Sequence, residues 1–151
     1  MQNGILEIRL AIPTDREGVR NCVRSAYEHY RGKIVDLPPV DQGIEDEINR
    51  HRVWVAVVGG EIVACIFLVT KTNYIKVANL AVDPNYQGKG LARKMIRVAE
   101  EQALAANKPE MSLVTHAKMP ENVKLYEHLG WEVVSRVENR IAMKKVLVPM
   151  Q

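Results

Sequence analysis

The segment Asn79–Arg93, with the sequence NLAVDPNYQGKGLAR, has the features of a backbone-held phosphate site. An apolar strand is expected to end at Val82, a turn containing Pro84 follows, and Gly88 and Gly90 precede an amphipathic helix. The N-terminus of a helix presents unpaired backbone N–H groups and the positive end of the helix dipole. Glycines at that point let the backbone approach an anion with no Cβ in the way. The segment therefore predicts a phosphate-bearing ligand.

Two common phosphate-binding loops do not fit this segment. A P-loop requires a longer spacing between its glycines and a lysine followed by serine or threonine. The Rossmann fingerprint requires a third glycine at the position of Arg93. Glu110 lies near the distance expected for a ribose-binding acid, but without the third glycine we interpret this as coincidence. The remaining pattern is Gln87-x-x-Gly90-x-Ala92.

That pattern, after a strand reading NLAVDP, resembles the acetyl-CoA signature of the GNAT superfamily of N-acetyltransferases. A second segment, Leu125–Trp131 (LYEHLGW), is similar to that family's Leu-Tyr-x-x-x-Gly-Phe signature. The order and distance of the two segments also resemble the family, and the resemblance covers nearly the whole chain. It implies transfer of the acetyl group of acetyl-CoA to a primary amine of a small molecule or peptide, by direct attack in a ternary complex and without a metal. The alternative is a non-catalytic acyl-CoA-binding sensor on the same fold.

The hydrophobic pattern predicts strands alternating with helices in the middle of the chain and hairpins at both ends. Thr14 and Glu17 are spaced as a capping box at the start of the first helix, and Gly59-Gly60 is a hairpin signal. We expect a mixed α+β fold, in which helices flank a GNAT-like, mostly antiparallel, splayed sheet, as one domain over residues 1–151. The expected strands are 5–12, 53–58, 61–70, 76–82, 111–115, 131–137 and 141–146; later helices are expected near 43–50, 91–107 and 121–129.

Composition excludes several other classes of protein. The chain has 151 residues, 47% of them hydrophobic, and a net charge of +3. No apolar stretch is long enough for a membrane span, and no basic stripe interleaved with aromatic residues predicts nucleic-acid binding. The start of the chain is more typical of a strand than of a signal peptide. Cys22 and Cys65 are expected to be reduced and buried, so a cytoplasmic protein is predicted.

The resemblance assigns acetyl-CoA binding mainly to the backbone. The amides of Leu80 and Val82 would pair with the pantetheine arm, and the Leu80 N–H would polarise the thioester carbonyl. Lys89 and Arg93, in or beside the first helical turn, would add positive charge for the phosphates. The complete set of cofactor residues is Leu80, Ala81, Val82, Gln87, Gly88, Lys89, Gly90, Leu91, Ala92, Arg93 and Asn122.

Tyr126 is the leading catalytic candidate, because the family's tyrosine at this position donates a proton to the departing CoA thiolate. A phenol pKa of about 10 lies above that of a thiol, so concerted transfer or hydrogen-bond stabilisation of the thiolate is the expected form. Many relatives carry asparagine where this chain has Met119. Asn122, four residues before Tyr126, either reaches the CoA backbone or caps the helix.

The general base is less clearly marked. Neither of the two strands expected to splay carries a carboxylate, 76–82 reading KVANLAV and 111–115 reading MSLVT. His116 has suitable chemistry at the end of the second strand, although a solvent-exposed loop histidine is the competing interpretation. Asn79 either holds a relay water or forms a hydrogen bond at the edge of the core. Proton loss through a chain of waters, with no dedicated base, is a further possibility.

The acceptor site is expected within Tyr27–Arg50, as in the family. Its acidic residues would either attract a cationic amine or form a solvated helix face; they are Asp41, Glu45, Asp46 and Glu47. Tyr27 and Tyr30 would line an amine pocket or lie at the edge of the core. The family resemblance also raises the prospect of a homodimer, but the sequence specifies neither an interface, nor the acceptor, nor the length of the acyl group.

Overall fold

The computed structural model describes residues 4–28 and 43–147, and these fall into two compact units. The first unit is Met1–Leu68 with Asn79–Ile96, and the second is Val69–Ala78 with Arg97–Gln151. The expectation of one domain over residues 1–151 stays a prediction. Tyr30 and Asp41 lie outside the described residues.

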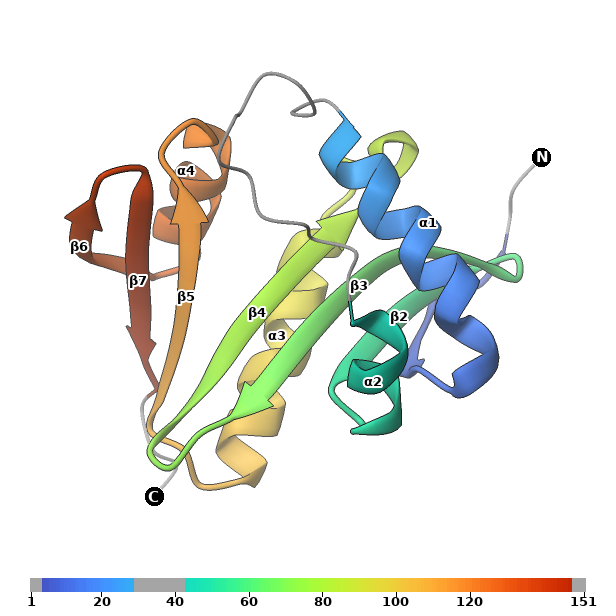
Figure 1. Cartoon of the computed structure of the whole chain (residues 1–151), viewed down its shortest axis with the longest axis horizontal. Helices are drawn as coiled ribbons and strands as arrows, with labels where there is room; N and C mark the ends of the chain where they lie inside the picture. The colour runs from blue at the N-terminus through green and yellow to red at the C-terminus, as the bar shows by residue number, and fades with distance from the viewer. Residues whose placement is uncertain (1–3, 29–42, 148–151) are drawn as a thin grey trace. The chain divides into compact units, whose positions relative to one another are not determined.

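The first unit is built on antiparallel strand pairs at the N-terminal end of the chain. β1 pairs with β2 and β2 pairs with β3, and Gly59 and Gly60 at the β2–β3 turn have φ angles of 57° and 81°, as a tight hairpin requires. Figure 1 shows α1 and α2 on the same side of β2 and β3. The elements are β1 (Glu7–Leu10), η1 (Pro13–Asp15), α1 (Arg16–Tyr27), α2 (Ile44–Asn49), β2 (Val53–Val58), β3 (Glu61–Thr70), the end of β4 (Tyr74–Val82), η3 (Pro84–Tyr86) and the start of α3 (Leu91–Ala105).

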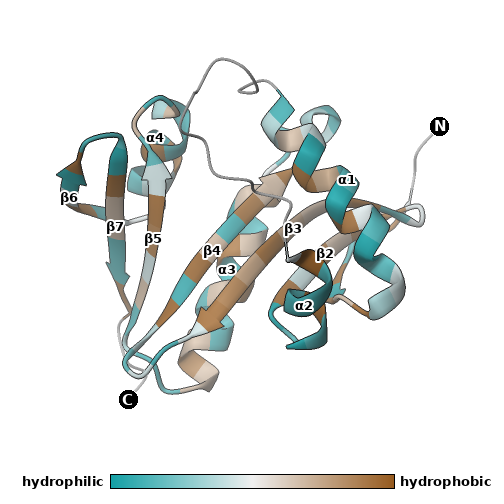
Figure 2. Cartoon of the chain, viewed as in Figure 1, coloured by the Kyte–Doolittle hydropathy of each residue, from teal (hydrophilic) through white to brown (hydrophobic). Residues whose placement is uncertain are grey.

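The core of this unit follows from the two helical stripes and the strand alternation. Val19 and Val23 share one face of α1 because they lie four residues apart, and Ile44 and Ile48 share one face of α2 for the same reason. Both faces belong to the core cluster. β3 is hydrophobic along most of its length (Figure 2), as a strand buried on both faces must be. The cluster also takes in Cys22, Val53, Val55, Cys65, Phe67 and Ala81. Both cysteines are free and buried, as expected.

The start of α1 differs from the sequence expectation. The N-cap of α1 is Asp15, and no side chain caps the helix, so the capping box of Thr14 and Glu17 is wrong. Pro13 instead begins a short 3₁₀ turn, which moves the N-cap one residue along the chain, from Thr14 to Asp15. The Asp15 carboxylate accepts the Ile12 N–H at 2.8 Å and pairs with the Arg9 guanidinium at 2.7 Å.

The second unit is a small sheet with one whole helix and part of another. Its elements are the first part of β4, the end of α3, β5 (Glu110–His116), α4 (Pro120–His128), β6 (Glu132–Val137) and β7 (Arg140–Val146). β7 lies antiparallel between β5 and β6 (Figure 1). Met111, Leu113, Ile141 and Met143 are buried, whereas Val114 is exposed, so β5 and β7 each alternate between a buried and an accessible face.

The sheet has the strand order β1-β2-β3-β4-β5-β7-β6 in the described residues. The β4–β5 pair is parallel, and its ladder runs only from Tyr74 and Glu110 to Val77 and Leu113. β4 continues five residues beyond this last pair, to Val82. The expected mixed α+β fold, with a mostly antiparallel sheet and flanking helices, is confirmed. Within the described ranges, none of the helices has the length and hydropathy needed to cross a membrane.

Candidate acetyl-CoA site

The C-terminal end of β4 presents backbone groups along the edge that faces away from β3. The Asp83 N–H donates to the Val63 carbonyl of β3 at 2.8 Å, which fixes the direction of its backbone. In an antiparallel pair, residues that bond to the partner strand alternate with residues that point away from it. The N–H groups of Leu80 and Val82 therefore point to the opposite edge of β4.

The loop after β4 is folded by its own side chains. The Asp83 carboxylate accepts the Asn85 N–H at 2.9 Å and caps the short turn η3. The Gln87 side chain donates to the Val82 carbonyl at 3.4 Å and so closes the loop back on the end of the strand. Gly88 and Gly90 have φ angles of 79° and 80°, and an added Cβ at either would meet nothing within 4 Å. Both glycines are thus required by backbone conformation and face open space.

Helix α3 starts immediately after this loop. The Gly90 carbonyl accepts the Lys94 N–H at 3.1 Å, so Gly90 is the last residue before the helix. The first turn carries no acidic side chain, and the backbone N–H groups there have no partner within the helix. The Lys89 ammonium lies 5.2 Å from the centre of the Tyr86 ring, and Arg93 is exposed. The arrangement suits a phosphate-bearing ligand electrostatically.

Tyr126 is buried within the second unit, on α4. Its ring centroid lies 5.6 Å from that of Trp131, with an interplanar angle of 56°. The backbone N–H of Trp131 donates to the backbone carbonyl of Tyr126 at 2.9 Å. The turn that ends α4 therefore brings the two rings together. The Trp131 indole N–H is buried and has no hydrogen-bond partner in the described residues. The sequence interpretation did not single out Trp131 for a contact with Tyr126, although both lie in LYEHLGW.

Asn122 is not the cap of α4. The helix begins at Pro120 with Met119 as its N-cap, so the capping alternative for Asn122 is wrong. Asn122 lies in the first turn, and its side-chain amide approaches the Met119 sulfur at 3.5 Å. The reason is that Pro120 fixes the first helical position, which leaves Asn122 inside the helix. Asn122 and Tyr126 share one face of α4, as their spacing predicts.

His116 accepts a hydrogen bond from its own chain. Its Nδ1 atom accepts the Lys118 N–H at 3.0 Å, which stabilises the turn between β5 and α4. A neutral imidazole has one basic nitrogen, and here this nitrogen is engaged by a backbone donor. This geometry favours a structural role, and the assignment of His116 as general base stays a prediction.

The acidic residues of α2 are individually paired with arginines. Glu45 pairs with Arg16 at 3.1 Å, Asp46 with Arg50 at 3.0 Å, and Glu47 with Arg52 at 3.4 Å. Their charge is therefore largely compensated. Glu45 and Asp46 are exposed, which favours the solvated helix face for these two residues. Glu47 is half-buried, and its Oε2 atom has no hydrogen-bond partner in the described residues.

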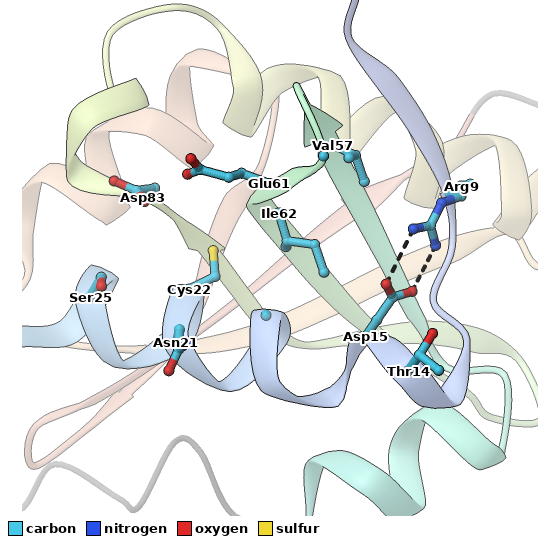
Figure 3. A pocket seen from close by; sticks show the side chains of 12 residues that line it. Arg9, Thr14, Asp15, Asn21, Cys22, Ser25, Val57, Glu61, Ile62 and Asp83 are labelled. Carbon is cyan, nitrogen blue, oxygen red and sulfur yellow. Dashed lines mark hydrogen bonds and ion pairs between the residues drawn. The ribbon is translucent and has the colours of Figure 1, made fainter. Parts of the chain in front are cut away.

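A pocket of about 380 Å³ lies between α1, the β2–β3 turn and the end of β4. Figure 3 shows the Arg9–Asp15 ion pair at one end of the pocket and Glu61 and Asp83 at the other. One cation and three carboxylates line it, which disfavours a phosphate ligand. The described residues contain no group of three or more metal-ligating side chains.

Comparison with known proteins identifies the class. A family model for the acetyltransferase (GNAT) domain matches residues 49–133, more than half of the chain. This chain therefore belongs to the acetyltransferase (GNAT) family. The expectation drawn from the two sequence signatures is confirmed.

Particular relatives share different lengths with this chain. N-acetylaspartate synthetase of Xenopus tropicalis is 34% identical over 90 residues, which are 58% of this chain and 33% of that protein. The chain thus matches about a third of the length of that relative. S-alkylcysteine N-acetyltransferase of Bacillus subtilis is 27% identical over 93% of this chain and 89% of its own length. The PaiA N-acetyltransferase of Thermoplasma acidophilum, crystallised with coenzyme A, has the same fold: its TM-score is 0.85 at 18% identity, covering 95% of this chain and 99% of that one.

Proposed function

We propose that this chain transfers the acetyl group of acetyl-CoA to the α-amine of an amino acid or a close derivative. The observation that carries the acetyl-CoA part of the proposal is the glycine loop, in which Gly88 and Gly90 adopt positive φ angles directly before an α3 first turn free of acidic side chains. Such a turn supplies several backbone donors to a pyrophosphate at once. The family match and the neighbour crystallised with coenzyme A support acetyl-CoA as the co-substrate.

We assign the residues of the site to binding and to catalysis in this proposal. The N–H groups of Leu80 and Val82 bind the pantetheine amides, and the Leu80 N–H also polarises the thioester carbonyl. Tyr126 stabilises the departing thiolate by donating a hydrogen bond. The residues proposed to hold the rest of the cofactor are Ala81, Gln87, Gly88, Lys89, Gly90, Leu91, Ala92, Arg93 and Asn122. The acceptor loses its proton to water, with His116 as the side chain to test as a base.

The relatives' acceptors support an amino-acid substrate. Their names specify aspartate and S-alkylcysteine, each of which presents a primary α-amine next to a carboxylate. The compensated charges of α2 do not favour a polyamine. We further propose that residues 1–151 act as one GNAT domain in the cytoplasm, which the two buried thiols support. A homodimer stays a prediction.

The test is a turnover assay with acetyl-CoA and a panel of amines. The panel contains S-methylcysteine, aspartate, other free amino acids, a peptide with a free N-terminus and spermidine. Release of CoA that requires a free amino acid and yields its N-acetyl product supports the proposal. Transfer to the peptide or to spermidine alone would overturn the amino-acid assignment. Binding of acetyl-CoA without transfer to any amine would favour the sensor.

A further inference from the structure

A partly buried hydroxyl–amide hydrogen bond joins the last turn of α1 to β4. The Tyr27 hydroxyl donates to Asn79 Oδ1 at 3.0 Å. The Tyr27 ring packs against the hydrophobic core of the first unit. Burial, with a smaller contribution from the Cys65 thiol, raises the pKa of Tyr27 to about 12. The phenol therefore remains protonated, and a donor, throughout the physiological range of pH.

A second contact joins α1 to the same stretch of β4. The Cys22 thiol lies 4.0 Å from the Ala81 carbonyl oxygen, a distance within reach of a weak S–H hydrogen bond. Asp83 is in turn bonded to β3 through its N–H. Three alternate residues, Asn79, Ala81 and Asp83, are thus each held by a neighbouring element. Leu80 lies between the first two.

We propose that Tyr27 is a positioning residue for acetyl transfer, because its hydrogen bond to Asn79 fixes the direction of the Leu80 N–H. This inference rests on the proposed function, in which that N–H polarises the thioester carbonyl. The Leu80 N–H belongs to the peptide unit that begins at Asn79, so rotation about the backbone of Asn79 turns the donor. The bond to the Asn79 side chain restrains that unit at its start, and the Cys22 contact restrains the Ala81–Val82 peptide unit, two units further along the strand.

Orientation matters more for this donor than for most others. A hydrogen bond weakens steeply as its angle departs from linearity. A donor aimed at a developing oxyanion contributes to the rate only if it is already aligned when the amine attacks. Loss of the Tyr27 hydroxyl should therefore reduce polarisation of the carbonyl more than it weakens the binding of CoA, because the phosphate loop and the Val82 N–H are unchanged.

The test is isotope-edited infrared spectroscopy of acetyl-CoA labelled with ¹³C at the thioester carbonyl, bound to the wild type and to Tyr27→Phe. The carbonyl band of the variant should shift to higher frequency, toward the position of free acetyl-CoA. With S-methylcysteine or whichever amine is turned over, kcat should fall about tenfold, less than the loss seen when an oxyanion donor is deleted outright. The KM for acetyl-CoA and the Kd for CoA should change by less than kcat does, because the phosphate loop and the Val82 N–H still bind the cofactor.

Matched variants separate positioning from stability. Asn79→Ala should reproduce the band shift, and the double variant should add nothing, since both changes break one link. Asn79→Ala also serves if Tyr27→Phe does not fold. Tyr74→Phe removes a hydroxyl from the same strand outside the link and should leave the band unchanged. An unshifted band in folded Tyr27→Phe and Asn79→Ala would overturn the inference alone, whereas a wild type that does not bind acetyl-CoA would overturn the proposed function and the inference with it.

Discussion

The rings of Tyr126 and Trp131 lie 5.6 Å apart in a tilted arrangement, and the Trp131 indole N–H has no hydrogen-bond partner in the described part of the chain. Tilted aromatic pairs at this distance hold each other's orientation. The Tyr126 ring is therefore fixed by a neighbour from the same signature segment. Because the indole N–H makes no hydrogen bond in the described residues, the contact between Trp131 and Tyr126 is one of packing and not a polar interaction.

Replacement of Tyr126 by phenylalanine should impair chemistry more than binding. The ring packing against Trp131 remains, whereas the hydroxyl proposed to stabilise the thiolate is lost. We expect kcat to fall about 100-fold, within the usual contribution of general-acid catalysis, with the KM for acetyl-CoA nearly unchanged. Steady-state kinetics beside Tyr74→Phe provide the measurement. Equal kcat values for wild type and Tyr126→Phe would remove Tyr126 from the mechanism.

Replacement of Trp131 by phenylalanine tests the packing role. Phenylalanine restores the residue usual in the family's signature and removes the unpartnered indole N–H. Phenylalanine is smaller than tryptophan and leaves a cavity at this buried position. We expect Trp131→Phe to be folded and active but less stable by about 1–3 kcal/mol, because removal of the indole N–H offsets part of the cost of the cavity. Thermal unfolding and turnover measure the two quantities. A loss of kcat as large as that of Tyr126→Phe would contradict a packing role.

Replacement of His116 by alanine should have a small effect on the acetyl-transfer rate. The Nδ1 atom accepts the Lys118 N–H, so the basic nitrogen already has a donor. We expect kcat/KM to fall less than about tenfold, below the usual contribution of a general base. The ascending limb of the pH profile of kcat/KM should persist in His116→Ala. Disappearance of that limb, with a large fall in rate at neutral pH, would establish His116 as the base.

The Arg9–Asp15 pair should make stability depend on pH in the acid range. The hydrogen bond from Arg9, with that from the Ile12 N–H, outweighs burial and lowers the pKa of Asp15. A carboxyl whose pKa is lower in the folded state stabilises the fold above its unfolded pKa of about 3.9. That contribution is lost as the pH falls through the lower, folded value.

Asp15→Asn provides the measurement for this pair. Urea denaturation of wild type and variant should differ at pH 6, and the difference should shrink steadily as the pH is lowered below about 4. Glu61→Gln, which alters another carboxylate of the same pocket without an ion pair in the described residues, is the control. A difference that stays constant down to acid pH would show that the ionised carboxylate contributes nothing.

Much of the fold follows from the sequence, because local signals and tertiary structure agree. β2 and β3 occupy the predicted ranges, since alternating hydrophobic residues and Gly59-Gly60 define both ends of the hairpin. β4 begins at Tyr74, two residues earlier than predicted, because its pairing with β5 extends the strand past the apolar segment. Pro13 starts a 3₁₀ turn before α1. The spacing of a capping box does not distinguish a 3₁₀ turn from the first turn of an α-helix.

The candidate site is predictable only where chemistry resides in contiguous residues. Glycine adopts positive φ angles without strain, so Gly88 and Gly90 indicate the backbone conformation of the loop. The loop could therefore be located from the sequence. The hydrogen bond between Tyr27 and Asn79 joins residues 52 positions apart, and neither residue type specifies the other. The engagement of His116 by Lys118 depends on the local turn geometry, which the sequence interpretation did not resolve.

The most direct test of the central claim is calorimetric titration of the protein with acetyl-CoA, beside ATP and NAD, repeated on Gly90→Glu. A glutamate there brings a carboxylate to the pyrophosphate position and strains a backbone with a φ of 80°. We predict saturable binding of acetyl-CoA alone, lost in a Gly90→Glu protein that retains its circular dichroism spectrum. Failure of the folded wild type to bind acetyl-CoA, or undiminished binding by Gly90→Glu, would contradict a pyrophosphate site at Gln87–Arg93.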